Sequence, residues 1–335
     1  MQSVLRALAR PLYPAASILC LHSVTTSEFP SDDPLHIPVP GLRALVRAVR
    51  RVAEFVPLDV LVRRHLAGQS TAGLVALTFD DAYAALREAV ERVLVPEKVP
   101  ATVFAVSDAL STGGSYWWDR LSEVNSLASA EQWEQFEHEA EVPPPYRQRG
   151  ASVEDRFLRI RRLILAEHAG RLSTRLDSAL ATLEAALGHR CAQRSMTMAE
   201  LRALAAYEGI RIGVHTCTHA VIPALSDADA IREIRDCHRA LRDQLPNTVP
   251  LLAIPYGLFD ARTASLSAQA GMEACLTLTG HALIGTGSDG VPRFCLDRRT
   301  SVMSVLLRTS GPAEYVRWIR GRRAADRPAL PTPLH

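Results

Sequence analysis

The sequence predicts an α/β fold in which parallel strands alternate with helices, arranged as a sheet or a barrel. Two features of its 335 residues predict this fold. Short runs that are apolar nearly throughout recur along the chain, as expected of strands that are covered on both faces. Segments with apolar residues at helical spacing separate many of these runs, and such alternation is typical of parallel α/β proteins.

Six runs have the length and composition of buried strands: residues 17–21, 74–79, 101–106, 210–214, 251–254 and 274–278. Amphipathic helices are expected at 39–54, 81–94 and 227–245. The last of these opens with Ser226 and Asp227, which favour the N-cap position.

The stretch 111–198 interrupts this alternation. It holds three tryptophans and a proline run at 143–145, followed by a long helical pattern. We therefore expect residues 1–110 and 199–322 to form the α/β unit and 111–198 to be a mostly helical insertion. Residues 323–335 carry three prolines and are expected to form an irregular tail.

Composition excludes some partners and suggests a compartment. The net charge of +2 gives no electrostatic reason to expect nucleic acid. The six cysteines form no C-x-x-C pair, which indicates reduced thiols. No stretch of about 18 apolar residues occurs, and arginines and prolines interrupt the apolar start of the chain. These features predict a cytoplasmic protein whose first helix makes at most peripheral membrane contact.

Two adjacent carboxylates, Asp80 and Asp81, directly follow the strand 74–79. Catalytic groups of α/β barrels gather at the carboxyl ends of the strands. A cation would relieve the repulsion of two neighbouring carboxylates and let both stay ionised. The alternative is a helix N-cap, a position that aspartate also favours.

His215 and His219 follow the strand 210–214 and are four residues apart, so one helical turn or tight loop can aim both imidazoles at one point. Two imidazoles and a carboxylate form a common three-ligand metal site with an open position. Cys217 lies between them and is interpreted as a packing residue. Pro255, Tyr256 and the following glycine form a third motif, which by itself indicates only a turn at a strand end.

The order of these motifs, TFDD at 78–81, HTCTH at 215–219 and PYG at 255–257, resembles the polysaccharide deacetylase family, also called the NodB-homology family or carbohydrate esterase family 4. The resemblance covers residues 17–110 and 196–299. It implies a distorted (β/α) barrel, usually of seven strands. It also implies a divalent metal, most often zinc, with cobalt, manganese or nickel as alternatives.

Carried over to this sequence, the resemblance makes Asp81, His215 and His219 the metal ligands. It makes Asp80 the general base that takes a proton from the attacking water. Ligation would fix Asp81, whereas Asp80 would remain free to accept the proton.

The sequence departs from the family pattern twice. Many members have an arginine before the proline of the third motif, where this chain has Ala253. Arg293 is a candidate to hold the base instead, with Arg298 and Arg299 as competitors. The late L-x-H motif, which supplies the acid, has no good match after residue 281. His22 follows the strand 17–21 and is proposed as the general acid. The alternative is that His22 only makes local hydrogen bonds.

Five residues are expected to contact the substrate: Pro255, Tyr256, Arg293, Trp117 and Trp118. Aromatic faces stack on sugars, so the two tryptophans could form a glycan platform. Their alternative role is to anchor the insertion against the barrel, because large aromatic side chains are usually buried.

Together these features predict metal-dependent hydrolysis of the N-acetyl group of an amino sugar. The substrate would be a bacterial glycan or glycan precursor, lipid-linked or nucleotide-linked, used in surface-polysaccharide biosynthesis. Two alternatives remain. One is a deformylase or other amide hydrolase on the same fold, and the other is a non-catalytic glycan-binding descendant.

Overall fold

The computed structural model describes residues 16–147, 150–279 and 290–309, and its main sheet is entirely parallel. Hydrogen bonding orders the strands β10-β9-β8-β7-β6-β5-β1-β11, and β4 pairs with β5 off this path. Their bounds are β1 (Ser17–Leu21), β4 (Glu54–Phe55), β5 (Leu74–Phe79), β6 (Ala101–Ala105), β7 (Ile210–Val214), β8 (Thr248–Ala253), β9 (Ala274–Thr277), β10 (Val291–Pro292) and β11 (Phe294–Cys295). All six predicted strands occur.

Residues 291–295 close the sheet into a barrel. β10 pairs with β9, β11 pairs with β1, and a single residue, Arg293, separates these two short strands. The Arg293 amide donates to the Thr277 carbonyl at 2.9 Å, and the Leu296 amide donates to the Cys20 carbonyl at 2.8 Å. The predicted (β/α) barrel is thereby confirmed. The sheet has nine strands rather than seven because β4 lies off the path and the closing segment counts as two strands.

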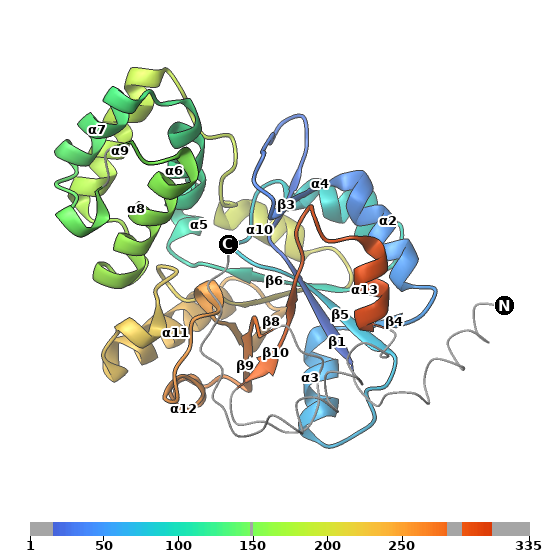
Figure 1. Cartoon of the computed structure of the whole chain (residues 1–335). Helices are drawn as coiled ribbons and strands as arrows, with labels where there is room; N and C mark the ends of the chain where they lie inside the picture. The colour runs from blue at the N-terminus through green and yellow to red at the C-terminus, as the bar shows by residue number, and fades with distance from the viewer. Residues whose placement is uncertain (1–15, 148–149, 280–289, 310–335) are drawn as a thin grey trace, which may run out of the picture.

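Helices surround the barrel (Figure 1). They are α2 (Val39–Val49), α4 (Leu86–Ala89) continued by η2 (Val90–Leu94), α5 (Ala109–Thr112), α10 (Met198–Ala205), α11 (Asp227–Arg242), α12 (Thr263–Gln269) and α13 (Val302–Thr309). The buried face of α3 (Leu58–Leu66) belongs to an apolar cluster that includes residues at the starts of the strands, among them Leu74 and Val249. This helix therefore covers the amino end of the barrel and leaves the carboxyl end to polar side chains.

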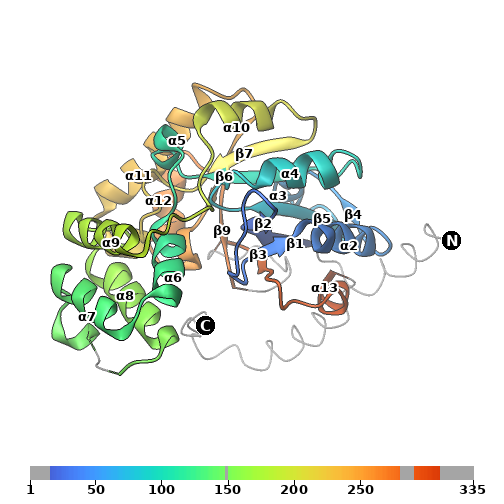
Figure 2. The ribbon, with the colours of Figure 1, turned by 90° about the horizontal axis from the view of Figure 1, so that it is seen from above.

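A helical lobe stands beside the barrel in both views (Figures 1 and 2). It comprises α6 (Trp117–Leu127), α7 (Ala130–Glu139), η3 (Pro144–Tyr146), α8 (Val153–Glu167) and α9 (Thr174–Leu187). These helices have their own apolar core, built around residues such as Trp133 and Phe136. The chain rejoins the barrel before α10, where Ser195 forms a β-bridge to Tyr83. The insertion therefore has a separate core within the predicted range 111–198.

Two predictions concern residues outside the described ranges: the amphipathic start of the chain and the irregular tail at 323–335. Within the described residues, no helix combines the length and apolarity needed to cross a membrane. A small second sheet pairs β2 (Ser23–Thr25) with β3 (His36–Pro38) directly after β1.

Candidate metal and catalytic site

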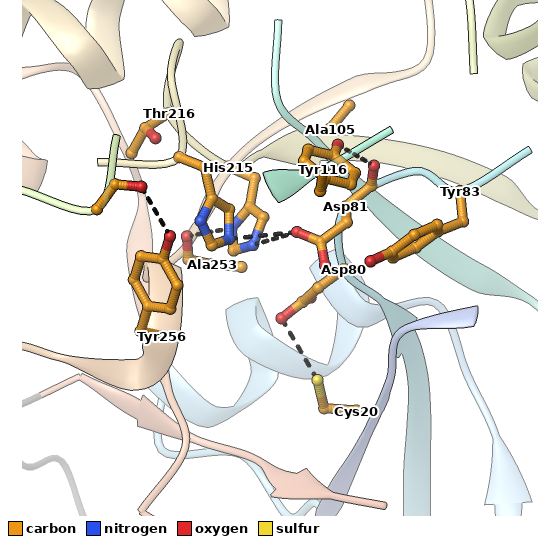
Figure 3. A network of polar contacts seen from close by, with 12 residues as sticks. Cys20, Asp80, Asp81, Tyr83, Ala105, Tyr116, His215, Thr216, Ala253 and Tyr256 are labelled. Carbon is orange, nitrogen blue, oxygen red and sulfur yellow. Dashed lines mark hydrogen bonds and ion pairs between the residues drawn. The ribbon is translucent and has the colours of Figure 1, made fainter. Parts of the chain in front are cut away.

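The three predicted metal ligands converge at the carboxyl ends of β5 and β7 (Figure 3). Asp81 Oδ1 lies 3.4 Å from His215 Nε2 and 3.2 Å from His219 Nε2. Two ligands bonded at about 2.0–2.1 Å in tetrahedral geometry lie about 3.3–3.4 Å apart. Asp81 therefore has the spacing from each histidine that a shared divalent cation requires, and all three ligand atoms lie within 4.8 Å of one another.

The protonation states of this group also suit a cation. Burial lowers the pKa of His219, which favours the neutral imidazole that ligates metals. Burial alone would raise the pKa of Asp81, but the two imidazoles outweigh it and hold the carboxyl ionised. Asp81 Oδ1 and His219 Nδ1 are buried without a hydrogen-bond partner among the described residues. A cation bound by Asp81 Oδ1 would satisfy this buried oxygen, which otherwise accepts no hydrogen bond within the described ranges.

A backbone carbonyl fixes the orientation of His215. Its Nδ1 lies 2.8 Å from the carbonyl oxygen of Ala253, the last residue of β8. A carbonyl can only accept, so Nδ1 carries the proton and Nε2 keeps its lone pair toward Asp81. The third motif follows directly, because Pro255 and Tyr256 begin the turn that ends this strand.

Left-handed backbone conformations gather at the site. Asp81, Thr216, His219 and Tyr256 have φ of 70°, 66°, 57° and 57°. Residues other than glycine rarely adopt such angles, and they persist only where the surroundings enforce them. His215 and His219 are therefore aimed by a tight loop rather than by a helical turn. Cys217 is half-buried and belongs to neither candidate ligand group, as expected of a packing residue.

Glu233 of α11 enforces the loop between the two histidines. Its carboxylate accepts from the Thr218 amide and from the Thr218 hydroxyl, both at 2.9 Å. The segment that follows β6 adds a contact, since the Ser107 amide donates to the Thr216 carbonyl at 3.3 Å. Glu233 is thus a positioning residue for His219.

We expect Glu233→Ala to weaken cation affinity by about 10–100-fold, as loss of outer-shell partners generally does. The loop would keep its sequence but lose the carboxylate that holds it in its strained conformation. Chelator competition measures the effect, and circular dichroism checks the fold. Asp236→Ala is the matched control, because Asp236 lies on the same helix and pairs with the exposed Arg239. Equal affinity in both variants would contradict the positioning role.

Arg293 holds Asp80. Its guanidinium donates to both carboxylate oxygens, at 2.7 and 2.8 Å, and its side chain is 0% exposed. Burial would raise the pKa of Asp80, but the guanidinium outweighs burial and lowers it. Arg298 instead donates to the carbonyls of Ser31 and His36. Arg293, placed by the strand that closes the barrel, therefore occupies the position proposed for the missing arginine.

Three of the five residues expected to contact the substrate are buried in this structure. Arg293 and Pro255 are buried, and Trp117 is only 7% exposed within the core of the insertion. Trp118 and Tyr256 are half-buried, with ring centroids 4.6 and 4.4 Å from that of His219. These two rings are thus the aromatic surfaces beside the candidate metal site.

The insertion contributes contacts that the sequence did not reveal. The Tyr116 hydroxyl donates to the Asp81 carbonyl at 2.5 Å. The Gly170 carbonyl accepts from Trp117 Nε1 at 2.9 Å and from the Tyr256 hydroxyl at 3.1 Å. A Cβ at Gly170 would lie 2.8 Å from the Tyr256 ring. An aromatic run at 116–118 was a signal for Tyr116, whereas nothing in the sequence marked Gly170.

His22 follows β1 and is half-buried. Burial lowers its pKa, but Cys295, Asp81 and Asp80 together raise it to about 10. The imidazole is therefore charged at neutral pH, which is the state that a proton donor needs.

A comparison with family models matches residues 184–275 to the family described as polysaccharide deacetylase. The matched segment holds His215, His219 and Tyr256, whereas Asp80 and Asp81 precede it. This match confirms the resemblance that the three motifs indicated. A search of curated proteins found no match.

Solved structures of deacetylases share the fold. IcaB from Ammonifex degensii is 16% identical, with a TM-score of 0.57 over 89% of this chain and 98% of that chain. The Streptococcus pyogenes deacetylase PplD in complex with acetate is 14% identical, with a TM-score of 0.56 over 88% and 98%. The de-N-acetylase from Aggregatibacter actinomycetemcomitans is 15% identical, with a TM-score of 0.52 over 87% and 98%. At these identities the likeness shows the fold.

Proposed function

We propose that this chain, whose residues 184–275 belong to the polysaccharide deacetylase family of carbon–nitrogen hydrolases, removes the N-acetyl group from an amino sugar with the help of a divalent metal. One observation carries the proposal. Asp81, His215 and His219 converge, while the adjacent Asp80 is held apart from them by Arg293. A non-catalytic glycan-binding protein would have no need of this second, separately oriented carboxylate.

Zinc is the proposed cation, with cobalt, manganese and nickel as alternatives, and when bound it would polarise the amide carbonyl and acidify water. Asp80 accepts the proton of the attacking water, and Arg293 keeps Asp80 ionised and oriented for that role. His22 donates a proton to the leaving amine, since amine expulsion requires protonation. Trp118 and Tyr256 offer aromatic surface to the sugar beside His219.

We expect His22→Asn to lower turnover by about 10²–10⁴-fold while the Asp81 site keeps its cation, because a general acid contributes on that scale. The wild-type rate should fall as pH rises through the His22 pKa of about 10, since the donor is active only when protonated. Acetate release measures both effects. His138→Asn is the control, because His138 is exposed on α7. Unchanged turnover in His22→Asn would remove its assignment as the acid.

The proposed substrate is an N-acetylated amino sugar in a glycan or a lipid- or nucleotide-linked precursor for surface polysaccharide. The test compares acetylated amino sugars, formylated amino sugars and cyclic ureides with the zinc-loaded protein, measuring released acid or amine. Acetate release should be fastest. Preferred formate release would favour a deformylase, and glycan binding without hydrolysis of any compound would favour a binding protein.

A further inference from the structure

A second group of ligand-type side chains lies next to Asp80. Cys20 is the penultimate residue of β1, and His22 directly follows that strand. Cys295 is the last residue of β11. One Sγ from each cysteine and one ring nitrogen of His22 all lie within 4.8 Å of one another. Cys20 Sγ also lies 3.4 Å from Asp80 Oδ2, on the side of Asp80 away from His215 (Figure 3).

Barrel closure builds this group. Cys20 and Cys295 are partners in register on the adjacent parallel strands β1 and β11. Side chains two residues apart along an extended chain point to the same side, so His22 follows Cys20 toward the same space. The closing segment thus brings together residues that are far apart in the sequence.

We propose that Cys20, His22 and Cys295 form a second metal site, distinct from the Asp81 site, for a thiophilic divalent ion such as Zn²⁺ or Cd²⁺. Two thiolates and an imidazole are the ligands that such ions prefer, and three protein ligands leave a fourth position open. His22 Nδ1 is buried and has no hydrogen-bond partner among the described residues. The donor set differs from that of the first site, which contains no sulfur.

The charges of the occupied group are compatible with the buried Arg293 nearby. Two thiolates and a neutral imidazole carry a net charge of −2, which a divalent ion neutralises. The occupied site therefore places no net positive charge beside the guanidinium.

A consequence follows that rests on the proposed function. An ion in the second site would occupy the His22 ring and remove the proton donor while the first site remains filled. Excess Zn²⁺ or Cd²⁺ should therefore inhibit acetate release by the zinc-loaded protein.

Cobalt(II) titration of the reduced full chain tests the second site independently of activity. We expect two equivalents to bind, one of them with thiolate-to-cobalt charge transfer in the near ultraviolet. Cys295→Ser and Cys20→Ser should each lose that absorption and keep the other equivalent, which also shows that these variants are folded. A His215→Ala/His219→Ala variant should keep the thiolate absorption and lose the other equivalent. Cys217→Ser is the control, because Cys217 lies between the histidines of the first site, and it should keep both equivalents.

The second site would be overturned if the wild-type protein bound one equivalent of cobalt without thiolate absorption. It would also be overturned if the thiolate absorption survived in Cys295→Ser or disappeared in Cys217→Ser. These experiments can reject the second metal site and the proposed function independently of each other. Thiolate absorption in a protein that releases no acetate would leave the site standing and remove the deacetylase proposal. Acetate release without thiolate absorption would do the opposite.

Discussion

Replacing Asp81 by asparagine should remove the cation from the Asp81 site and lower kcat/KM by at least about 10²–10³-fold, the cost of losing a preorganised electrostatic group. Among the three ligands, Asp81 supplies the negative charge, and its Oδ1 faces both imidazoles at 3.2 and 3.4 Å. Asparagine keeps the shape of the side chain but not its charge. Metal analysis after dialysis and an acetate-release assay measure the two effects.

The fold should survive this substitution. Asp81 has φ of 70°, and asparagine tolerates the left-handed region about as well as aspartate does. A matched control is Asp177→Asn, which neutralises a half-exposed carboxylate of the insertion that pairs with Arg120. The same cation content as wild type in the Asp81→Asn protein, with wild-type turnover, would show that the three side chains do not form the working site.

The strands were predictable because a doubly covered strand must be apolar throughout. The predicted bounds of β1, β5 and β7 coincide with the observed ones. The closing segment was not predicted, because its two strands have two residues each and one includes Pro292. Its pairing depends on the barrel around it rather than on its own composition.

The helix predicted at 81–94 begins late, and the reason lies in the site. Asp81 and Ala82 have φ of 70° and 50°, which helices do not allow, and α4 begins at Leu86. The Ala84 amide donates to the carbonyl of Arg194 instead of to its own helix, at 2.9 Å. Amphipathic spacing indicates which face is buried, but it carries no information about a backbone that tertiary contacts bend toward a functional site.

The convergence of Asp81, His215 and His219 was predictable because each follows a recognisable strand, and carboxyl ends of parallel strands meet at one edge. The burial of Trp117 was not predictable, since it depends on how the insertion packs on itself. The pairing of Cys20 with Cys295 was also hidden. Spacing along the chain cannot show a contact that exists only after the barrel closes.

Arg293→Met should destabilise the protein by about 3–5 kcal/mol at neutral pH, because removing one partner of a buried ion pair leaves the other charge uncompensated. Methionine approximates the volume of the arginine stem, and Arg293 is 0% exposed, so the main loss is its charge beside Asp80. Urea denaturation at several pH values measures the effect. Asp80→Asn/Arg293→Met should be less destabilised than Arg293→Met alone, because neither charge is then left unpaired.

The loss of stability in Arg293→Met should depend on pH in a defined direction. In the wild type the Asp80 pKa is depressed below the value of about 3.9 that it has in the unfolded chain. The ionised carboxylate therefore stabilises the fold above that pH, and this stabilisation is lost as pH falls through the pKa of the folded state. Without Arg293, burial dominates and raises that pKa, and the variant should gain stability as falling pH neutralises the carboxyl. The difference between wild type and variant should therefore be largest near neutral pH and shrink toward acid. In its proposed role as the base, Asp80 must be ionised to accept a proton, so the acid limb of the rate profile should move to higher pH in Arg293→Met. The stability difference could instead stay constant with pH while the acid limb of the rate profile does not move. That outcome would mean that Arg293 only packs in the barrel wall and does not keep Asp80 ionised.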